Sequence, residues 1–172
     1  LFSFLIMMVV LFPLISIYLM YKNKVITTYS MPNRKERLPV LFFMITYYSM
    51  TYYIFRNWNE TLLNLLSPYL SFLFATLILL IILLLVTALW KISLHTASIA
   101  GLSGGLMAEL AVASEVSNST VIVIINSIIL LFLGVVSFAR LYLKAHTFMQ
   151  TIAGLAIGFS VMFTVVYFQW KI

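Results

Sequence analysis

The segment 65–90 carries no charged residue and consists mainly of Leu, Ile, Phe, Ala and Val. A helix needs about 20 mostly apolar residues to cross the hydrocarbon core of a bilayer, where lipid offers the backbone no hydrogen bonds. The segment is therefore predicted to be a transmembrane helix. Five other segments are predicted to span the membrane in the same way: 1–20, 38–55, 95–112, 121–138 and 148–168. The sequence thus predicts an all-α fold, a polytopic membrane helix bundle of about six transmembrane helices.

The scarcity of charge excludes a soluble domain of ordinary composition. Only 8% of the residues are charged, whereas soluble domains have about 25%. Cysteine is absent, which excludes disulfides and thiolate metal sites. No linker, low-complexity segment or repeat divides the chain, so a single transmembrane domain, 1–172, is expected. The chain begins inside a predicted span and without Met, so we also expect residues upstream of Leu1.

Two predicted helices carry small residues at helical spacing. Ala97, Gly101 and Gly105 are four residues apart in 95–112, and Gly154 and Gly158 have the same spacing in 148–168. Faces of small residues let helix backbones approach closely in lipid. We therefore expect these two helices at the centre of the bundle. The helix 65–90, with its uniform Leu and Ile surface, is expected to face lipid.

The cations gather on one predicted side of the membrane. Alternation of the spans places the loops 21–37, 91–95 and 139–147 on the same side, together with both histidines. Eight of the ten Lys and Arg residues fall there: Lys22, Lys24, Arg34, Lys35, Arg37, Lys91, Arg140 and Lys144. Only Arg56 and Lys171 fall on the other side. The positive-inside rule makes the cation-rich side cytoplasmic. Since the charge lies in short loops between spans, no nucleic-acid partner is expected.

These three loops are expected to bring cations, His95 and His146 together. Cations at helix ends suit a phosphate or another multiply charged anion. Two histidines beside a phosphate suit phosphoryl transfer, because one can attack phosphorus and the other can protonate the leaving oxygen. Ser93 and the first amides of the following helix can hold a phosphate oxygen. The alternative is that basic residues such as Lys22, Lys24 and Lys144 only mark topology, and that each histidine is structural.

The same residues resemble the motifs of a known family. Arg140-x5-His146-x3-Gln150, preceded by Ala139, resembles the third motif of the type 2 phosphatidic acid phosphatase superfamily, S-R-x5-H-x3-D. Ser93-Leu94-His95 is similar to its second motif, P-S-G-H. Arg37-Leu38-Pro39, after Arg34 and Lys35, is similar to its first motif, K-x6-R-P. The order of the motifs agrees, the resemblance covers about 33–163, and the segment 32–37 looks like a divergent branch common in Bacteroidetes.

The resemblance implies a lipid phosphatase with the helical core shared by lipid phosphatases and vanadium haloperoxidases. His146 would be the nucleophile that forms a phosphohistidine, His95 the general acid, and Gln150 the residue that orients His146. The phosphate would be held by Arg140, Ser93, Arg37, Lys35, Arg34 and Lys91. No metal or other cofactor is implied. The implied partners are the bilayer and a lipid phosphate substrate, such as phosphatidic acid, phosphatidylglycerol phosphate or a polyprenyl diphosphate, in a bacterial inner membrane; no protein partner is indicated.

Four features depart from the family pattern: Gln150 replaces Asp, Leu94 replaces Gly, Ala139 replaces Ser, and the first motif lacks the Arg-Pro dipeptide. An alternative function is therefore a catalytically weak or inactive relative that acts as a lipid-binding or assembly subunit. A channel or transporter is a second alternative, but no inverted repeat or pair of interrupted spans supports it. The side of the site stays open, because the family resemblance favours the outer face and the charges favour the cytoplasm.

Overall fold

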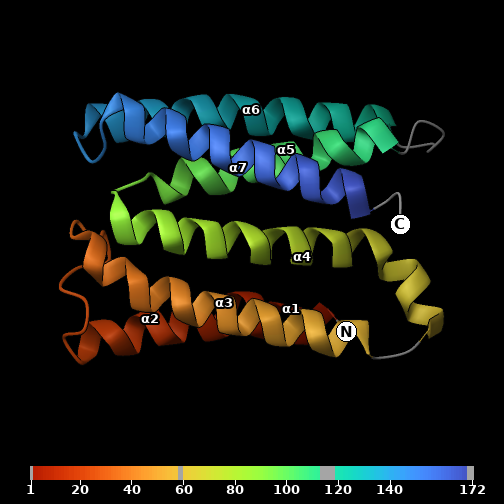
Figure 1. Cartoon of the computed structure of the whole chain (residues 1–172), viewed down its shortest axis with the longest axis horizontal. Coiled ribbons are helices and arrows are strands. Elements are labelled where there is room, and N and C mark those ends of the chain that lie inside the picture. The colour runs from red at the N-terminus through yellow and green to blue at the C-terminus, as the bar shows by residue number, and fades with distance from the viewer. Residues whose placement is uncertain (1, 58–59, 113–118, 170–172) are drawn as a thin grey trace. The chain divides into compact units, whose positions relative to one another are not determined.

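The computed structural model describes residues 2–57, 60–112 and 119–169, and every regular element in these ranges is helical (Figure 1). Lys171, one of the two cations expected on the opposite side, lies outside the described residues. In chain order the elements are α1 (Phe2–Ile6), a π-helical segment (Met7–Leu11), α2 (Phe12–Lys22), α3 (Arg34–Arg56), α4 (Glu60–Leu89), α5 (Leu94–Val112), α6 (Ser119–Tyr142) and α7 (Phe148–Gln169). The predicted helical membrane bundle is confirmed.

Five helical stretches of the described residues are long and apolar enough to cross a membrane. They are Ser3–Lys22, Arg34–Arg56, Pro68–Leu89, Thr120–Tyr142 and Phe148–Gln169. The first of them runs without a break through α1, the π-helical segment and α2. The remaining predicted span, α5, forms a helix of 19 residues but is less apolar than the other five.

The chain divides into two compact units, an N-terminal unit of residues 1–91 and a C-terminal unit of residues 92–172. In the N-terminal unit, α3 packs against α4 and against α2. In the C-terminal unit, α5 packs most extensively against α7 and also against α6. The single domain 1–172 expected from the sequence stays a prediction.

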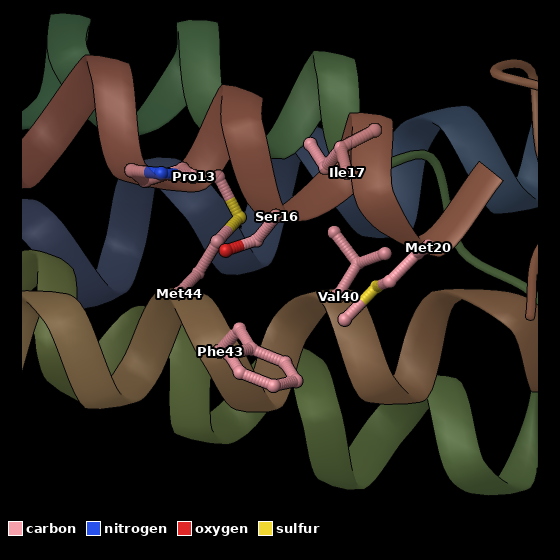
Figure 2. Close-up of a pocket in the computed structure, with 7 residues that line it drawn as sticks. All are labelled: Pro13, Ser16, Ile17, Met20, Val40, Phe43 and Met44. Carbon is pink, nitrogen blue, oxygen red and sulfur yellow. The ribbon is translucent and has the colours of Figure 1, made fainter. Parts of the chain in front are cut away.

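A seam of apolar side chains joins α2 to α3 in the N-terminal unit. Figure 2 shows this seam, which leaves no room for a water molecule and is lined by Pro13, Ser16, Ile17, Met20, Val40, Phe43 and Met44. The Ser16 hydroxyl hydrogen-bonds the Tyr47 hydroxyl across the two helices, with 2.7 Å between the oxygens. At one end of the seam, Ile26 of the α2–α3 loop is buried with Met20 and Val40. The loop is therefore packed onto the helices that it joins.

The lower hydropathy of α5 accompanies close packing in the C-terminal unit. Its buried residues are all small or hydroxylated: Thr96, Ala97, Ala100, Gly101, Ser103, Gly104, Gly105 and Ala108. Helices in lipid associate through such residues, because they let neighbouring backbones approach. A helix enclosed by its neighbours therefore needs small side chains more than it needs high hydropathy.

The crossing of α5 and α7 confirms the close approach expected from the two small-residue faces. A methyl group added at Gly158 would overlap the backbone carbonyl of Ala97, and one added at Gly154 would lie 2.6 Å from the carbonyl oxygen of Ser93. Gly104, which the spacing of four does not single out, would overlap the backbone of Phe159 in the same way. These contacts involve backbone atoms, so they cannot be relieved by a change of rotamer.

The expectation that 65–90 faces lipid stays a prediction, and one part of α4 is packed inside the molecule. The buried share is 33% for Pro68–Leu89, but 11% for Thr120–Tyr142 in α6. Leu79, Leu80 and Leu83 are among the buried residues of α4. A helix that is apolar on every side gives no periodic signal that separates a lipid-facing surface from a packed one.

We predict that Gly158→Ala destabilises the protein by about 1–3 kcal/mol, since the added methyl group must push α7 away from the Ala97 carbonyl. Gly134→Ala is the matched control, because nothing lies within 4 Å of a methyl group added at Gly134. The control should be neutral or more stable by up to about 1 kcal/mol, from helix propensity alone. Thermal unfolding of both variants in detergent measures the difference, and equal melting temperatures would contradict the tight crossing.

Candidate phosphate-binding site

The end of α6 is a left-handed turn that connects Arg140 to His146 through the backbone. Lys144 has a φ of 50°, in the left-handed region. The Ala145 N–H donates to the Arg140 carbonyl at 3.1 Å, and the Lys144 N–H donates to the Leu141 carbonyl at 3.0 Å. These two bonds are those of a Schellman motif, which closes a helix and more often uses Gly at the left-handed position. The His146 N–H also donates to the Arg140 carbonyl, at 3.3 Å.

The start of α7 is a reciprocal helix cap made by Thr147 and Gln150. The Gln150 N–H donates to Thr147 Oγ1 at 3.4 Å, and the Thr147 N–H donates to Gln150 Oε1 at 3.2 Å. This is the capping box, in which Ser or Thr and a Glu or Gln three residues later satisfy each other's backbone N–H groups. The sequence Thr147-x-x-Gln150 predicts this capping box. When Gln150 is compared only with the Asp of the family motif, its role in the cap is missed. Gln150 therefore has a structural role at the helix start.

The same Gln150 oxygen determines how the His146 ring is held. His146 is buried, with 7% of its surface exposed, and its Nδ1 lies 3.2 Å from Gln150 Oε1. The Thr147 N–H can donate only to the amide oxygen, so the orientation of the Gln150 amide is determined. An oxygen cannot donate, so the ring contact is a hydrogen bond only when Nδ1 carries the proton. A neutral His146 ring in this geometry has its lone pair on Nε2.

Ser93 lies at the start of α5 and connects that helix to α7. Its N–H donates to the Gln150 carbonyl at 3.2 Å, and its own carbonyl accepts from the Ala97 N–H at 3.1 Å and from the Thr96 hydroxyl at 3.0 Å. The Ser93 hydroxyl is fully buried and has no hydrogen-bond partner among the described residues. Buried hydroxyls without a partner are uncommon. Because this hydroxyl is enclosed, a ligand oxygen could contact it only after a movement at the start of α5.

Within the C-terminal unit the structure thus brings together the main chains of Ser93, Arg140, His146 and Gln150. The Arg140 side chain is half-buried in the last turn of α6. His95 lies in the first turn of α5 and is exposed. Its carbonyl accepts from the Ser98 hydroxyl at 3.0 Å. The expected meeting of the His95 and His146 rings stays a prediction.

The first predicted motif lies at the start of a helix and not in a loop. α3 begins at Arg34, four residues before the predicted 38, because the Asn33 side chain caps it by accepting the Lys35 N–H at 3.1 Å. Pro39 accordingly lies inside the helix rather than in its first turn. Proline has no N–H, so it cannot donate the usual hydrogen bond to the carbonyl four residues earlier.

The arginines of this segment are engaged with backbone carbonyls of the N-terminal unit. Arg37 is buried, and its Nε–H donates to the Met31 carbonyl at 2.9 Å. Arg34 donates through Nη1 to the Leu89 carbonyl, which connects the start of α3 to the end of α4. Lys35 is exposed and Lys91 is half-buried. The phosphate-binding role expected of these four residues stays a prediction, whereas Arg34 and Arg37 also have these structural contacts.

Two further findings concern the chemistry and the relatives of the chain. In the part of the chain that the structure describes, no group of three or more His, Cys, Asp or Glu residues is placed to hold a metal ion. No protein-family model matches the chain, and neither a curated protein nor a solved structure matches it. Any functional assignment therefore depends on the residues themselves.

We predict that Thr147→Ala destabilises the start of α7 by about 0.5–2 kcal/mol, because the Gln150 N–H loses its acceptor. Thr147→Ser keeps the hydroxyl oxygen and should restore most of the loss. Thermal unfolding in detergent gives the global effect, and amide hydrogen exchange at residues 148–151 gives the local one. If both variants exchange at the same rate as the native chain, the capping box does not stabilise this helix.

Proposed function

We propose that the chain is a membrane lipid phosphatase that hydrolyses a lipid phosphomonoester or a polyprenyl diphosphate through a phosphohistidine on His146. One observation carries the proposal: buried His146 lies 3.2 Å by its Nδ1 from Gln150 Oε1, in the turn that also contains Arg140. This contact favours a ring whose Nε2 lone pair is directed away from Gln150. A histidine oriented in this way is suited to nucleophilic attack.

In the first step, Nε2 of His146 attacks phosphorus and the bond from phosphorus to the leaving oxygen breaks. His95 donates its proton to that oxygen, so the lipid alcohol (or, from a diphosphate, the lipid monophosphate) departs protonated. In the second step, water attacks phosphorus, neutral His95 accepts the water proton, and the P–N bond breaks to release phosphate. The Arg140 guanidinium and the Ser93 hydroxyl would hold the oxygens that remain on phosphorus.

Gln150 makes this a slow enzyme. As the ring becomes a cation during attack, an aspartate would stabilise it by charge as well as by a hydrogen bond, whereas the Gln150 carbonyl supplies only the hydrogen bond. In serine proteases, loss of the charge that orients the catalytic histidine costs about 10⁴ in kcat. That figure is an analogous upper guide for this site. The substrate would enter from the bilayer, which we propose to be a bacterial inner membrane.

A second function is favoured by a specific observation. Gln150 caps α7 and the Ser93 main chain connects α5 to α7, so both residues have structural reasons to be present without chemistry. A catalytically inactive relative that binds lipid phosphate or serves as an assembly subunit would retain the same contacts. Turnover distinguishes the two functions.

We expect the purified full-length chain to release phosphate slowly from phosphatidic acid or from a polyprenyl diphosphate, and His146→Ala to release none. Gly134→Ala is the matched control, since it changes an exposed residue of α6 away from the site. Acid-labile, base-stable labelling from a ³²P-labelled substrate would report the phosphohistidine. If the native chain matches His146→Ala on both substrates, the enzyme is excluded and the lipid-binding role replaces it.

We further expect Gln150→Glu to raise kcat above the native value. Glutamate has the same length as glutamine and is itself a capping-box residue, so it keeps the helix cap while adding a charge beside Nδ1. Gln150→Leu removes the acceptor and should lower both kcat and stability. A Gln150→Glu variant that folds normally and turns over no faster than the native chain would show that the charge does not limit the reaction.

A further inference from the structure

Three lysines project from the end of the N-terminal unit where α2 ends and α3 begins. Lys22, Lys24 and Lys35 are all exposed. Among the residues that the structure describes, none of the three side chains has a hydrogen-bond or ion-pair partner. They differ in this from the arginines of the same segment, since Arg34 and Arg37 donate to the Leu89 and Met31 carbonyls. The lysines are thus the cations of this segment that remain for an external anion.

Negative charge is nearly absent beside these lysines. Glu36 supplies the one carboxylate of residues 22–37. Its oxygens accept from the Thr27 N–H at 3.1 Å and from the Thr27 hydroxyl at 3.1 and 3.2 Å. Both carboxylate oxygens are therefore occupied by the loop itself. The surface keeps a strong excess of positive charge, which attracts anions over about a Debye length.

Two tyrosines stand within the same segment. The rings of Tyr21 and Tyr29 have centroids 4.5 Å apart, and the side chains are 42% and 56% exposed. Tyr is enriched at the membrane–water interface because its ring is apolar and its hydroxyl can form hydrogen bonds with water. The pair at the end of a membrane-spanning helix is suited to the depth of the lipid headgroups.

The loop that carries these residues is held in one conformation. Lys24 has a φ of 59°, with the Val25 N–H donating to the Met20 carbonyl at 2.9 Å and the Lys24 N–H to the Tyr21 carbonyl at 3.1 Å. This is the same helix-closing turn that ends α6. Together with the burial of Ile26, it means that little backbone order has to be gained on binding.

We propose that Lys22, Lys24 and Lys35, together with Tyr21 and Tyr29, form a basic–aromatic surface that binds the headgroups of anionic phospholipids in the bilayer. The occupant is a bilayer lipid and not a soluble anion, because the apolar rings of the tyrosines gain free energy by contact with lipid and gain none from a soluble anion. The binding is independent of phosphate chemistry at His146.

The test titrates the detergent-solubilised full-length chain with dioleoylphosphatidylglycerol or dioleoylphosphatidylcholine and counts bound lipids by native mass spectrometry. Phosphatidylglycerol is a phosphodiester, so it reports binding without being a phosphatase substrate. The native chain should prefer phosphatidylglycerol. A Lys22→Gln/Lys24→Gln variant should lose about fivefold in affinity for each lysine removed. Lys22→Arg/Lys24→Arg keeps the charge and should retain the preference.

Arg56→Gln is the matched control, because it removes one cation from the opposite end of α3 and should leave the preference unchanged. The proposal is overturned if the double Gln variant binds phosphatidylglycerol as the native chain does. It is also overturned if glycerol phosphate competes as well as the lipid, since the site would then be a soluble-anion site. Loss of binding in His146→Ala would place the lipid at the His146 site and refute a separate surface. A failure of phosphatase activity leaves this test unaffected.

Discussion

The backbone groups at the ends of membrane helices must be satisfied near the lipid surface, and this requirement shapes most of what the chain can do. Lipid supplies no partners for the last carbonyls and first N–H groups of a helix. Here α2 and α6 end in left-handed turns at Lys24 and Lys144, and α7 begins in a capping box. Two of the candidate catalytic residues, His146 and Gln150, lie within or directly beside these caps. The geometry of the site is therefore a consequence of how the helices end.

The crossing of α5 and α7 adds a second constraint. Because Gly154 and Gly158 have no side chains, the α5 backbone lies against α7, and the Ser93 N–H reaches the Gln150 carbonyl at 3.2 Å. The distance between the starts of the two helices thus depends on glycines located about two and three turns into α7. A methyl group at Gly154 would press directly on the Ser93 carbonyl, and one at Gly158 would act through the Ala97 carbonyl. The packing of small residues between α5 and α7 therefore also determines where the polar groups at the helix starts lie.

The sequence predicts the spans well, because an apolar segment of about 20 residues is a signal averaged over many positions. It predicts helix starts less well, because a start depends on a single polar side chain, as when Asn33 begins α3 four residues early. The carbonyl contacts of Arg34 and Arg37 are tertiary and leave no trace in residue spacing. The buried positions of α4 likewise cannot be identified from the sequence, because its content of Leu and Ile is uniform around the helix. Of the candidate site, the sequence predicts the pairing of His146 with Gln150 but not Thr147 or the role of Ser93 as a link.

Gln150 shows why a change at one position can preserve geometry and remove charge. Its oxygen accepts from the Thr147 N–H and lies within hydrogen-bond distance of His146 Nδ1, so one amide serves both the helix and the ring. An aspartate here would be one methylene shorter and would have to divide its reach between those two donors. Glutamine reaches both but brings no negative charge into a region next to the bilayer, where a buried carboxylate is costly unless it is paired. The helix cap and the ring orientation would therefore be the same in an enzyme and in an inactive relative. The orientation of His146 is therefore compatible with an enzyme and with an inactive lipid-binding relative, because the hydrogen bond that fixes the ring is the same in both.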